Sequence, residues 1–344
     1  MALRINPARL PVWRDPHTLQ RGMGREAVTV TDIWAEEERL INLLFRGVAN
    51  ESLGIMERSI GIEHDRATAL LARLRPALLD SSPDENRASL SEEFVQQAFA
   101  EIIRASFEHN VDGQQVLARR RTHSVCIGVL DRVTLALALG LVAAGVGRVH
   151  CLDDSPVMLS DTGPLGFETS FVGQPKSAAL QSLLTKRAGC TWGEASVGAL
   201  GKARPTILIV SANHPLSESD LNDLRSSHES LARDIAVLTI ELGVENSRVS
   251  PILRPPDTPC LDCRNLSMID KDAQWASLAS QLRSRRERLD DAQSALLCAG
   301  LALEKCLRFI DSPQRSAFDA HVVDHRSGMI FNESWSYRTD CGCR

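Results

Sequence analysis

The sequence is poor in aromatic residues: its 344 residues include one Tyr, and Phe, Trp and Tyr together account for 4%. Proteins that hold single-stranded nucleic acid stack the bases on aromatic side chains, so this composition disfavours that class. A basic excess is also lacking, since the net charge is -5 and the isoelectric point is near 6.0. We therefore expect neither nucleic acid nor a membrane surface as a partner.

Long apolar runs are absent too, because none approaches the roughly 20 residues that a transmembrane helix needs. The N-terminal segment MALRINPARLPVWRD carries charges and prolines where a signal peptide has its apolar core. Nine cysteines are an odd number and do not suggest a disulfide framework, whereas clustered cysteines in a reducing compartment more often bind metal. We expect a cytoplasmic, soluble protein.

Residues 1–80 are expected to form a small winged-helix-like α+β domain. Two short strands are predicted at 18–20 and 27–30, around a turn that contains Gly22. Three helices are predicted after them, at 32–45, 51–60 and 65–79. The segment has eleven Arg and no Lys against eleven Asp plus Glu, and this neutrality disfavours binding to a phosphate backbone. Peptide or protein recognition and a purely packing role remain as alternatives.

Residues 81–120 are expected to be a linker and a helix. The linker reads SSPDENR, and Ser89 with Glu92 forms a possible capping box for a helix that ends near Phe107. A second, larger domain is expected from residue 121 to 344.

Residues 125–176 have the pattern of the first half of a Rossmann-type sheet: strand, tight turn, apolar helix, second strand. Asp153 and Asp154 end the second strand, where a carboxylate would accept hydrogen bonds from a ribose. A phosphate-binding turn needs G-x-G-x-x-G so that the backbone can approach the phosphate, and the turn from Gly128 to Val133 has one glycine. The fold signal is therefore good and the phosphate-binding signal poor.

The rest of this domain alternates between buried strands and helices. Strands are predicted at 206–211 and 235–242, helices at 174–188, 216–232 and 293–309, and a hairpin around Ser327-Gly328. This alternation predicts an α/β fold: a Rossmann-like, mostly parallel sheet with helices on both faces.

Two cysteine pairs have the spacing of metal ligands. Cys260 and Cys263 are separated by two residues in a Pro-flanked loop, and Cys341 and Cys343 by one glycine. Four thiolates from two close pairs match a tetrahedral structural zinc site. The alternative is four unrelated cysteines. The other five are expected to be small core residues: Cys126, Cys151, Cys190, Cys298 and Cys306.

The order AAGVGRV, LDD, VMLSD, VGQPK, PCLDC and a late cysteine pair resembles the ThiF/MoeB/HesA family, the adenylyltransferases similar to ubiquitin-activating enzymes. The resemblance covers about residues 124–344. It implies binding of ATP and Mg²⁺, adenylation of the C-terminal carboxylate of a small protein or peptide, a homodimer and a structural zinc. It also implies that the following residues contact the nucleotide: Gly128, Asp153 or Asp154, and Lys176.

Other nucleotide-contacting positions of the family have changed. Where the family has Ser-Asn-Leu-x-Arg-Gln, this chain has Asp161 in place of the Asn and Pro164 in place of the Arg. The family's Mg²⁺-binding Asp falls near Ala212-Asn213, where no Asp is present. A carboxylate near a triphosphate is repulsive, and the charge clamp is lost.

The layout also looks like a narrower branch, found in the biosynthesis of thiazole/oxazole-modified peptides. There a ThiF-like protein with a winged-helix domain similar to PqqD binds the leader of a precursor peptide and presents it to a YcaO-type cyclodehydratase. We predict this non-catalytic role. The alternative is an active adenylyltransferase whose ATP site is rebuilt from Arg132, Arg148 and Lys176. A nicotinamide or flavin oxidoreductase would explain neither the cysteine pairs nor VGQPK.

Two further features have simple structural interpretations. His214, after a strand at the edge where α/β folds bind ligands, is a site candidate but more often a loop histidine. The run Arg283, Arg285, Arg286 and Arg288 is expected on a solvated, salt-bridged helix face. No residue is assigned a catalytic role.

Overall fold

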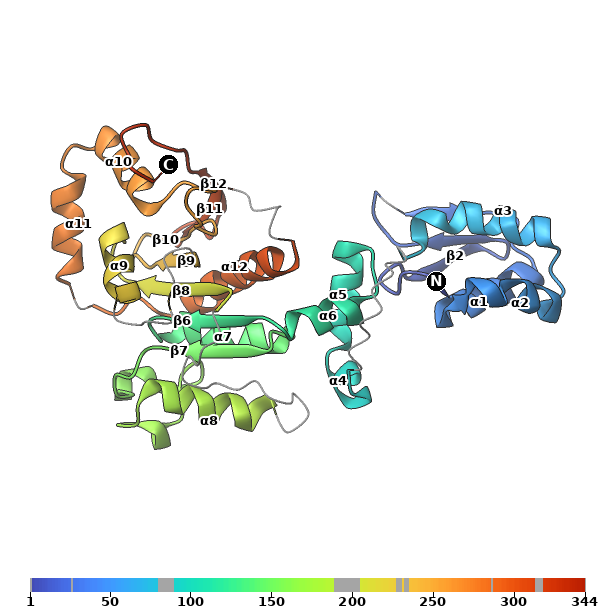
Figure 1. The fold of residues 1–344 in the computed structure, drawn as a ribbon, viewed down its shortest axis with the longest axis horizontal. Helices are drawn as coiled ribbons and strands as arrows, with labels where there is room; N and C mark the ends of the chain where they lie inside the picture. The colour runs from blue at the N-terminus through green and yellow to red at the C-terminus, as the bar shows by residue number, and fades with distance from the viewer. Residues whose placement is uncertain are drawn as a thin grey trace. The chain divides into compact units, whose positions relative to one another are not determined.

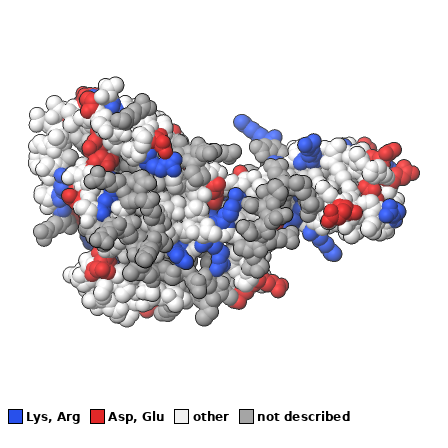
Figure 2. Space-filling view, viewed as in Figure 1, with Lys and Arg blue, Asp and Glu red and all other residues white. Residues whose placement is uncertain are grey.

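The computed structural model describes residues 2–25, 27–79, 90–188, 205–226, 231, 235–285, 287–312 and 318–343. The chain forms two compact units, Met1–Arg119 and Arg120–Arg344 (Figure 1). No helix in these ranges is long and apolar enough to cross a membrane. On the visible face of each unit, acidic and basic side chains are interspersed (Figure 2).

The first unit contains a three-stranded antiparallel sheet in the order β2–β3–β4. These strands are β2 (Pro11–Asp15), β3 (Thr18–Arg21) and β4 (Val28–Val30), while β1 (Ala2–Leu3) pairs with β5 (Val48–Ala49). Three helices accompany the sheet: α1 (Ala35–Arg46), α2 (Leu53–Ile60) and α3 (His64–Leu74). Short 3-10 turns follow β5 and α3, at η1 (Asn50–Ser52) and η2 (Arg75–Ala77).

The core of this unit follows from helical and strand periodicity. α1 buries Leu40 and Leu44, four residues apart, and α3 buries Leu70 and Leu74 in the same cluster. α2 ends where Gly61 adopts the left-handed conformation, with φ of 78°. The sequence predicted β3, β4 and the three helices but missed β2, because all five β2 residues are exposed and leave no alternation to read.

Three more helices belong to the first unit: α4 (Glu92–Gln97), α5 (Phe99–His109) and α6 (Gly113–Arg120), of which the last crosses the boundary. The side chain of Ser91 accepts the backbone N–H of Phe94 and begins α4, whereas the predicted cap Ser89 lies outside the described residues. Asn6 Nδ2 donates to the carbonyl oxygen of Ser106 at 2.8 Å, which ties α5 to the start of the chain.

The second unit is built on a seven-stranded sheet in the order β12–β11–β10–β9–β8–β6–β7. Neighbours β7, β6, β8 and β9 are parallel, whereas β10, β11 and β12 pair antiparallel, so five of the seven strands point the same way. The strands are β6 (Ser124–Ile127), β7 (Arg148–Cys151), β8 (Ile207–Ala212), β9 (Ala236–Glu241), β10 (Asn246–Val249), β11 (Asp319–Asp324) and β12 (Ile330–Ser334).

Both faces of this sheet are covered, as the predicted α/β class requires. Successive residues of β8 point to opposite faces of the sheet, so Ile207 and Leu208 enter two different apolar clusters. One cluster contains α7 (Arg132–Ala143), α8 (Lys176–Ala188) and α12 (Ala292–Asp311); the other contains α9 (Glu218–Ser226) and α10 (Leu261–Lys271). Figure 1 shows α8 beside the edge strand β7 and α11 (Trp275–Arg283) next to α10. The predicted fold class is confirmed.

A buried ion pair joins the start of this unit to α12. Arg120 Nη2 donates to Asp311 Oδ2 at 2.7 Å, its Nε donates to Asp311 Oδ1 at 3.0 Å, and its Nη1 donates to the carbonyl oxygen of Ala144 at 3.0 Å. Both side chains are almost fully buried. Removing one partner leaves an uncompensated buried charge, whereas replacing both by apolar residues removes that penalty.

We therefore expect Arg120→Met to lower the free energy of unfolding by about 3–5 kcal/mol. The double variant Arg120→Met/Asp311→Leu should recover most of this loss. Urea unfolding followed by circular dichroism measures both, and a single variant as stable as the parent would show that the pair is not the constraint described here.

Candidate functional site

The turn after β6 lies where the family pattern predicts a phosphate. Gly128 is held there by its backbone, whose N–H donates to the carbonyl oxygen of Ile209 at 2.8 Å. A Cβ atom at Gly128 would lie 2.8 Å from Leu224 Cδ2 of α9. Any larger residue at position 128 would therefore require the Leu224 side chain to shift.

Carboxylates of the protein itself accept hydrogen bonds from the N–H groups of this turn. Leu130 N donates to Asp153 Oδ2 at 3.0 Å, and Thr134 N donates to Asp131 Oδ1 at 2.9 Å. Arg132 N, the first helical N–H of α7, donates to Asp290 Oδ2 at 3.2 Å. Helix N-termini bind phosphate through such N–H groups and their partial positive charge. Here three aspartates supply the negative charge instead.

The surroundings of two of these aspartates shift the pKa values of their carboxyl groups. Desolvation raises the pKa of Asp131, despite the hydrogen bonds that it accepts from Thr134. Burial would also raise the pKa of Asp290, but hydrogen bonds from the Arg288 side chain and the Arg132 N–H outweigh burial and lower it. The ionised form of Asp290 is therefore favoured beside the start of α7.

The predicted nucleotide residues lie together but are engaged with one another. Lys176 Nζ lies 3.3 Å from Asp153 Oδ2 and donates to the carbonyl oxygen of Leu130 at 2.9 Å. The other oxygen of Asp153 accepts from Ser155 N at 3.1 Å. The side chains of Lys176 and Asp153 are 14% and 13% exposed. Asp154 instead accepts a hydrogen bond from Ser177.

Sequence reasoning missed Arg288 and Asp290 as parts of this site. Arg288 contacts the buried carboxylate of Asp161, and its Nε donates to Asp290 Oδ1 at 3.0 Å. The prediction of a helix for this arginine run was wrong, because α11 ends at Arg283 and Arg288 lies outside any helix; Arg286 lies outside the described residues. Asp161 in place of an Asn was the available signal, since a buried carboxylate needs a cation.

Other candidate residues lie apart from this cluster or engage the backbone. Asn213 Nδ2 donates to the carbonyl oxygen of Glu287 at 3.1 Å. His214 is half-buried, and burial lowers the pKa of its imidazole. Arg148 pairs with Ser124 at the start of β6, which is the opposite end of the strand from the turn at Gly128. Arg148 is therefore not available to rebuild a phosphate site.

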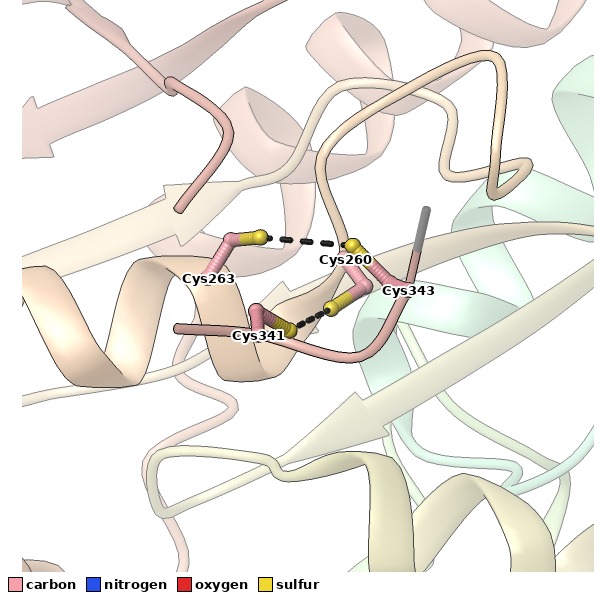
Figure 3. Close-up of side chains that lie close together, drawn as sticks. All are labelled: Cys260, Cys263, Cys341 and Cys343. Carbon is pink, nitrogen blue, oxygen red and sulfur yellow. Dashed lines mark hydrogen bonds between the residues drawn. The ribbon is translucent and has the colours of Figure 1, made fainter. Parts of the chain in front are cut away.

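The four predicted metal ligands come together (Figure 3). Cys260 Sγ lies 3.5 Å from Cys341 Sγ, Cys263 Sγ lies 3.4 Å from Cys343 Sγ, and all four sulfurs lie within 4.8 Å of one another. Metal–sulfur bonds of ~2.3 Å in a tetrahedron separate the sulfurs by ~3.8 Å. The cluster could therefore bind a metal. The first pair lies at the start of α10 and not wholly in a loop as predicted, since Cys260 is the residue before the helix.

The segment that carries the second pair is held by its own contacts. Arg338 forms ion pairs with Asp270 and Asp340, and Tyr337 Oη donates to the carbonyl oxygen of Pro256 at 2.8 Å. The cysteines outside the cluster are mostly buried, and desolvation raises the pKa values to about 12 for Cys126, Cys151, Cys298 and Cys306. Cys190 lies outside the described residues.

Comparison with known proteins gives matches by structure alone. No family model and no curated protein sequence matches the chain. The structure of E. coli MccB with ATP matches with a TM-score of 0.64 and 14% identity, covering 100% of this chain and 99% of that chain. The microcin C7 biosynthetic enzyme MccB in complex with N-formylated MccA matches with 0.66 and 13%, with the same coverage. PaaA matches with 0.66 and 16%, covering 95% of this chain and 98% of that chain.

The chain thus has the fold of MccB and PaaA from the first unit through the second. This agrees with the fold that the resemblance to the ThiF/MoeB/HesA family implied.

If the sulfur cluster binds a metal, the purified protein should contain one metal ion per chain. Cys263→Ala and Cys343→Ala should each remove it and lower the melting temperature, because a structural ion stabilises only the folded state. Elemental analysis by plasma mass spectrometry measures the content, with Cys151→Ala as the matched control. Full metal content in both cluster variants would exclude this site.

Proposed function

We propose that this protein is a ThiF-like peptide-binding protein that no longer adenylates. In this proposal its first unit binds the leader of a precursor peptide and presents it to a partner modifying enzyme, a YcaO-type cyclodehydratase. The proposed loss of adenylation rests on the turn at residues 130–134. Its N–H groups donate hydrogen bonds to Asp131, Asp153 and Asp290.

A triphosphate would have to displace these carboxylates. Hydrogen bonds to charged groups contribute about 1.5–3 kcal/mol each. Asp161 adds a further carboxylate near Arg288, so the phosphates would meet like charges. Ala212 stands at the end of β8 where the family has its Mg²⁺ ligand, so this position supplies no carboxylate to hold a metal ion.

In this proposal the peptide binds at the edge of β4, beside α3. Among the described residues, β4 pairs with β3 alone, and α3 contacts β4. An extended peptide can add to such an edge through main-chain hydrogen bonds. An open surface hollow of about 660 Å³ lies between the start of α1 and α3 and is lined by Asp32, Trp34, Glu36, Glu37, Arg66, Ala69 and Arg73.

Trp34 is the side chain best suited to anchor a peptide in this hollow. It is 55% exposed, and its ring lies 4.2 Å from the ring of His17. The backbone N–H of Trp34 donates to Glu37, which is buried and paired with Arg66. An exposed aromatic ring fixed in one position is typical of binding hot spots. The complex of MccB with N-formylated MccA, which shares the fold of both units, supports a ligand of this kind.

The remaining parts of the proposal follow from the resemblance. The sulfur cluster holds a structural zinc, which supplies no open coordination position for catalysis. The protein is a cytoplasmic homodimer.

An active adenylyltransferase is the second candidate. It is favoured by the retained Asp153 and Lys176 and by the structure of E. coli MccB with ATP.

Calorimetric titration with Mg-ATP separates the two candidates. We expect no binding of Mg-ATP at about 1 mM, a concentration at which a site of micromolar affinity is saturated. E. coli MccB is the positive control. Micromolar affinity would contradict our proposal, and Lys176→Ala should then abolish pyrophosphate exchange.

If a precursor-peptide gene lies beside the gene of this protein, its labelled synthetic leader tests the peptide site by fluorescence anisotropy. Trp34→Ala should weaken binding at least tenfold, about 1.4 kcal/mol, because the anchor is lost. The matched control is Trp13→Ala, an exposed tryptophan on β2 that does not line the hollow. Equal losses for the two variants would locate the peptide elsewhere.

A further inference from the structure

The second unit contains a cavity that the proposed function does not use. It has a volume of about 220 Å³ and lies between α12 and the strands β11 and β12. In the sheet these strands are separated from β6, which precedes the turn at Gly128, by β10, β9 and β8. The cavity is thus a separate site from the nucleotide-like cluster.

One wall of the cavity is apolar. Leu301 and Phe309 of α12 line it two helical turns apart, and Ile252, after β10, completes that wall. Lys305 lies between Leu301 and Phe309 on the same face of the helix. An apolar wall with a few convergent polar groups is the usual composition of a small-molecule site.

Two carboxylates and two cations line the cavity, and one ion pair forms between them. Glu304 forms an ion pair with Arg308, and Asp319 Oδ1 accepts from Ser334 Oγ. Lys305 Nζ donates to the main-chain oxygen of Asp319 at 2.7 Å, and no described carboxylate lies within ion-pairing distance of it. Burial lowers the pKa of Lys305, while the charges of Glu304 and Asp319 act on it in the opposite direction from beyond ion-pairing distance.

His321 is a second polar group of this cavity whose side chain is incompletely paired. His321 of β11 lines the cavity, and its buried Nδ1 has no hydrogen-bond partner. Burial, and then the charge of Lys305, lowers the pKa of His321, which favours the neutral imidazole, whose one N–H can donate a hydrogen bond. Asn332 lies opposite His321 on β12 and adds an amide to the lining.

We propose that this cavity binds a small organic carboxylate, with its anionic end on Lys305 and its apolar body against Leu301 and Phe309. A monoanion supplies the ion-pairing partner that Lys305 lacks at contact distance among the described residues. A dianion such as phosphate is disfavoured, because Glu304 and Asp319 lie on the same cavity and phosphate has no apolar body. The volume equals that of about seven water molecules at ~30 Å³ each, which suits a ligand the size of benzoate.

Calorimetric titration of the full chain with benzoate, benzamide and inorganic phosphate tests this site. Benzoate should bind, and benzamide, which has the same shape without the charge, should bind at least tenfold more weakly. Phosphate should not bind. Equal affinities for benzoate and benzamide, or no binding of benzoate at about 10 mM, would overturn the proposal.

Variants locate the binding. Lys305→Met keeps the length of the side chain and should weaken benzoate at least tenfold, whereas Lys271→Met, an exposed lysine on α10, should leave it unchanged. Leu301→Trp fills the apolar wall and should abolish binding while Lys305 remains. Circular dichroism confirms that each variant folds, and the comparison of benzoate with benzamide needs no variant. Unchanged affinity in folded Lys305→Met would exclude this cavity as the site.

Discussion

The start of α7 is the point on which the second unit depends. A helix N-terminus carries partial positive charge and unpaired N–H groups, and these must be satisfied when the helix packs against a sheet. Here Asp131 comes from the turn itself, Asp153 from the end of β7 and Asp290 from the segment before α12. Satisfying one helix end therefore fixes three segments that are distant in sequence.

The same arrangement explains why Asp161 is tolerated. A carboxylate in place of an Asn would destabilise a site built for phosphates, but Arg288 lies against it and also contacts Asp290. Asp161, Arg288 and Asp290 thus form one electrostatic unit beside the start of α7. Reversing any one of them alone would leave an unpaired charge.

The fold was largely predictable from the sequence, because β6, β8, β9 and α12 are continuous apolar runs that must be buried. β2 was not predictable, since its residues are all exposed. β10 was missed as well, because its four residues, of which Asn246 is exposed, give too short a pattern to read.

The sequence predicted part of the candidate site: Asp153 and Lys176 lie together, and the four cysteines form a cluster. The missing glycines and the missing Mg²⁺ ligand are visible in the sequence, and the cysteine pairs are local motifs that the fold brings together. The partners that fill the turn were not visible: Asp290 binds the N–H of Arg132 across 158 positions, and Arg288 reaches Asp161 across 127. Such pairings depend on the path of the chain and leave no local periodicity.

The sulfur cluster has a topological consequence. Cys260 and Cys341 are 81 positions apart, and the chain between them includes α11, α12 and the hairpin of β11 and β12. An ion bound by both pairs closes this stretch into a ring, and ring closure removes more conformational entropy from the unfolded chain as the ring grows. The Lys305 cavity is built almost entirely inside that ring. Such an ion would therefore stabilise the folded state of the walls of this cavity without touching any of them.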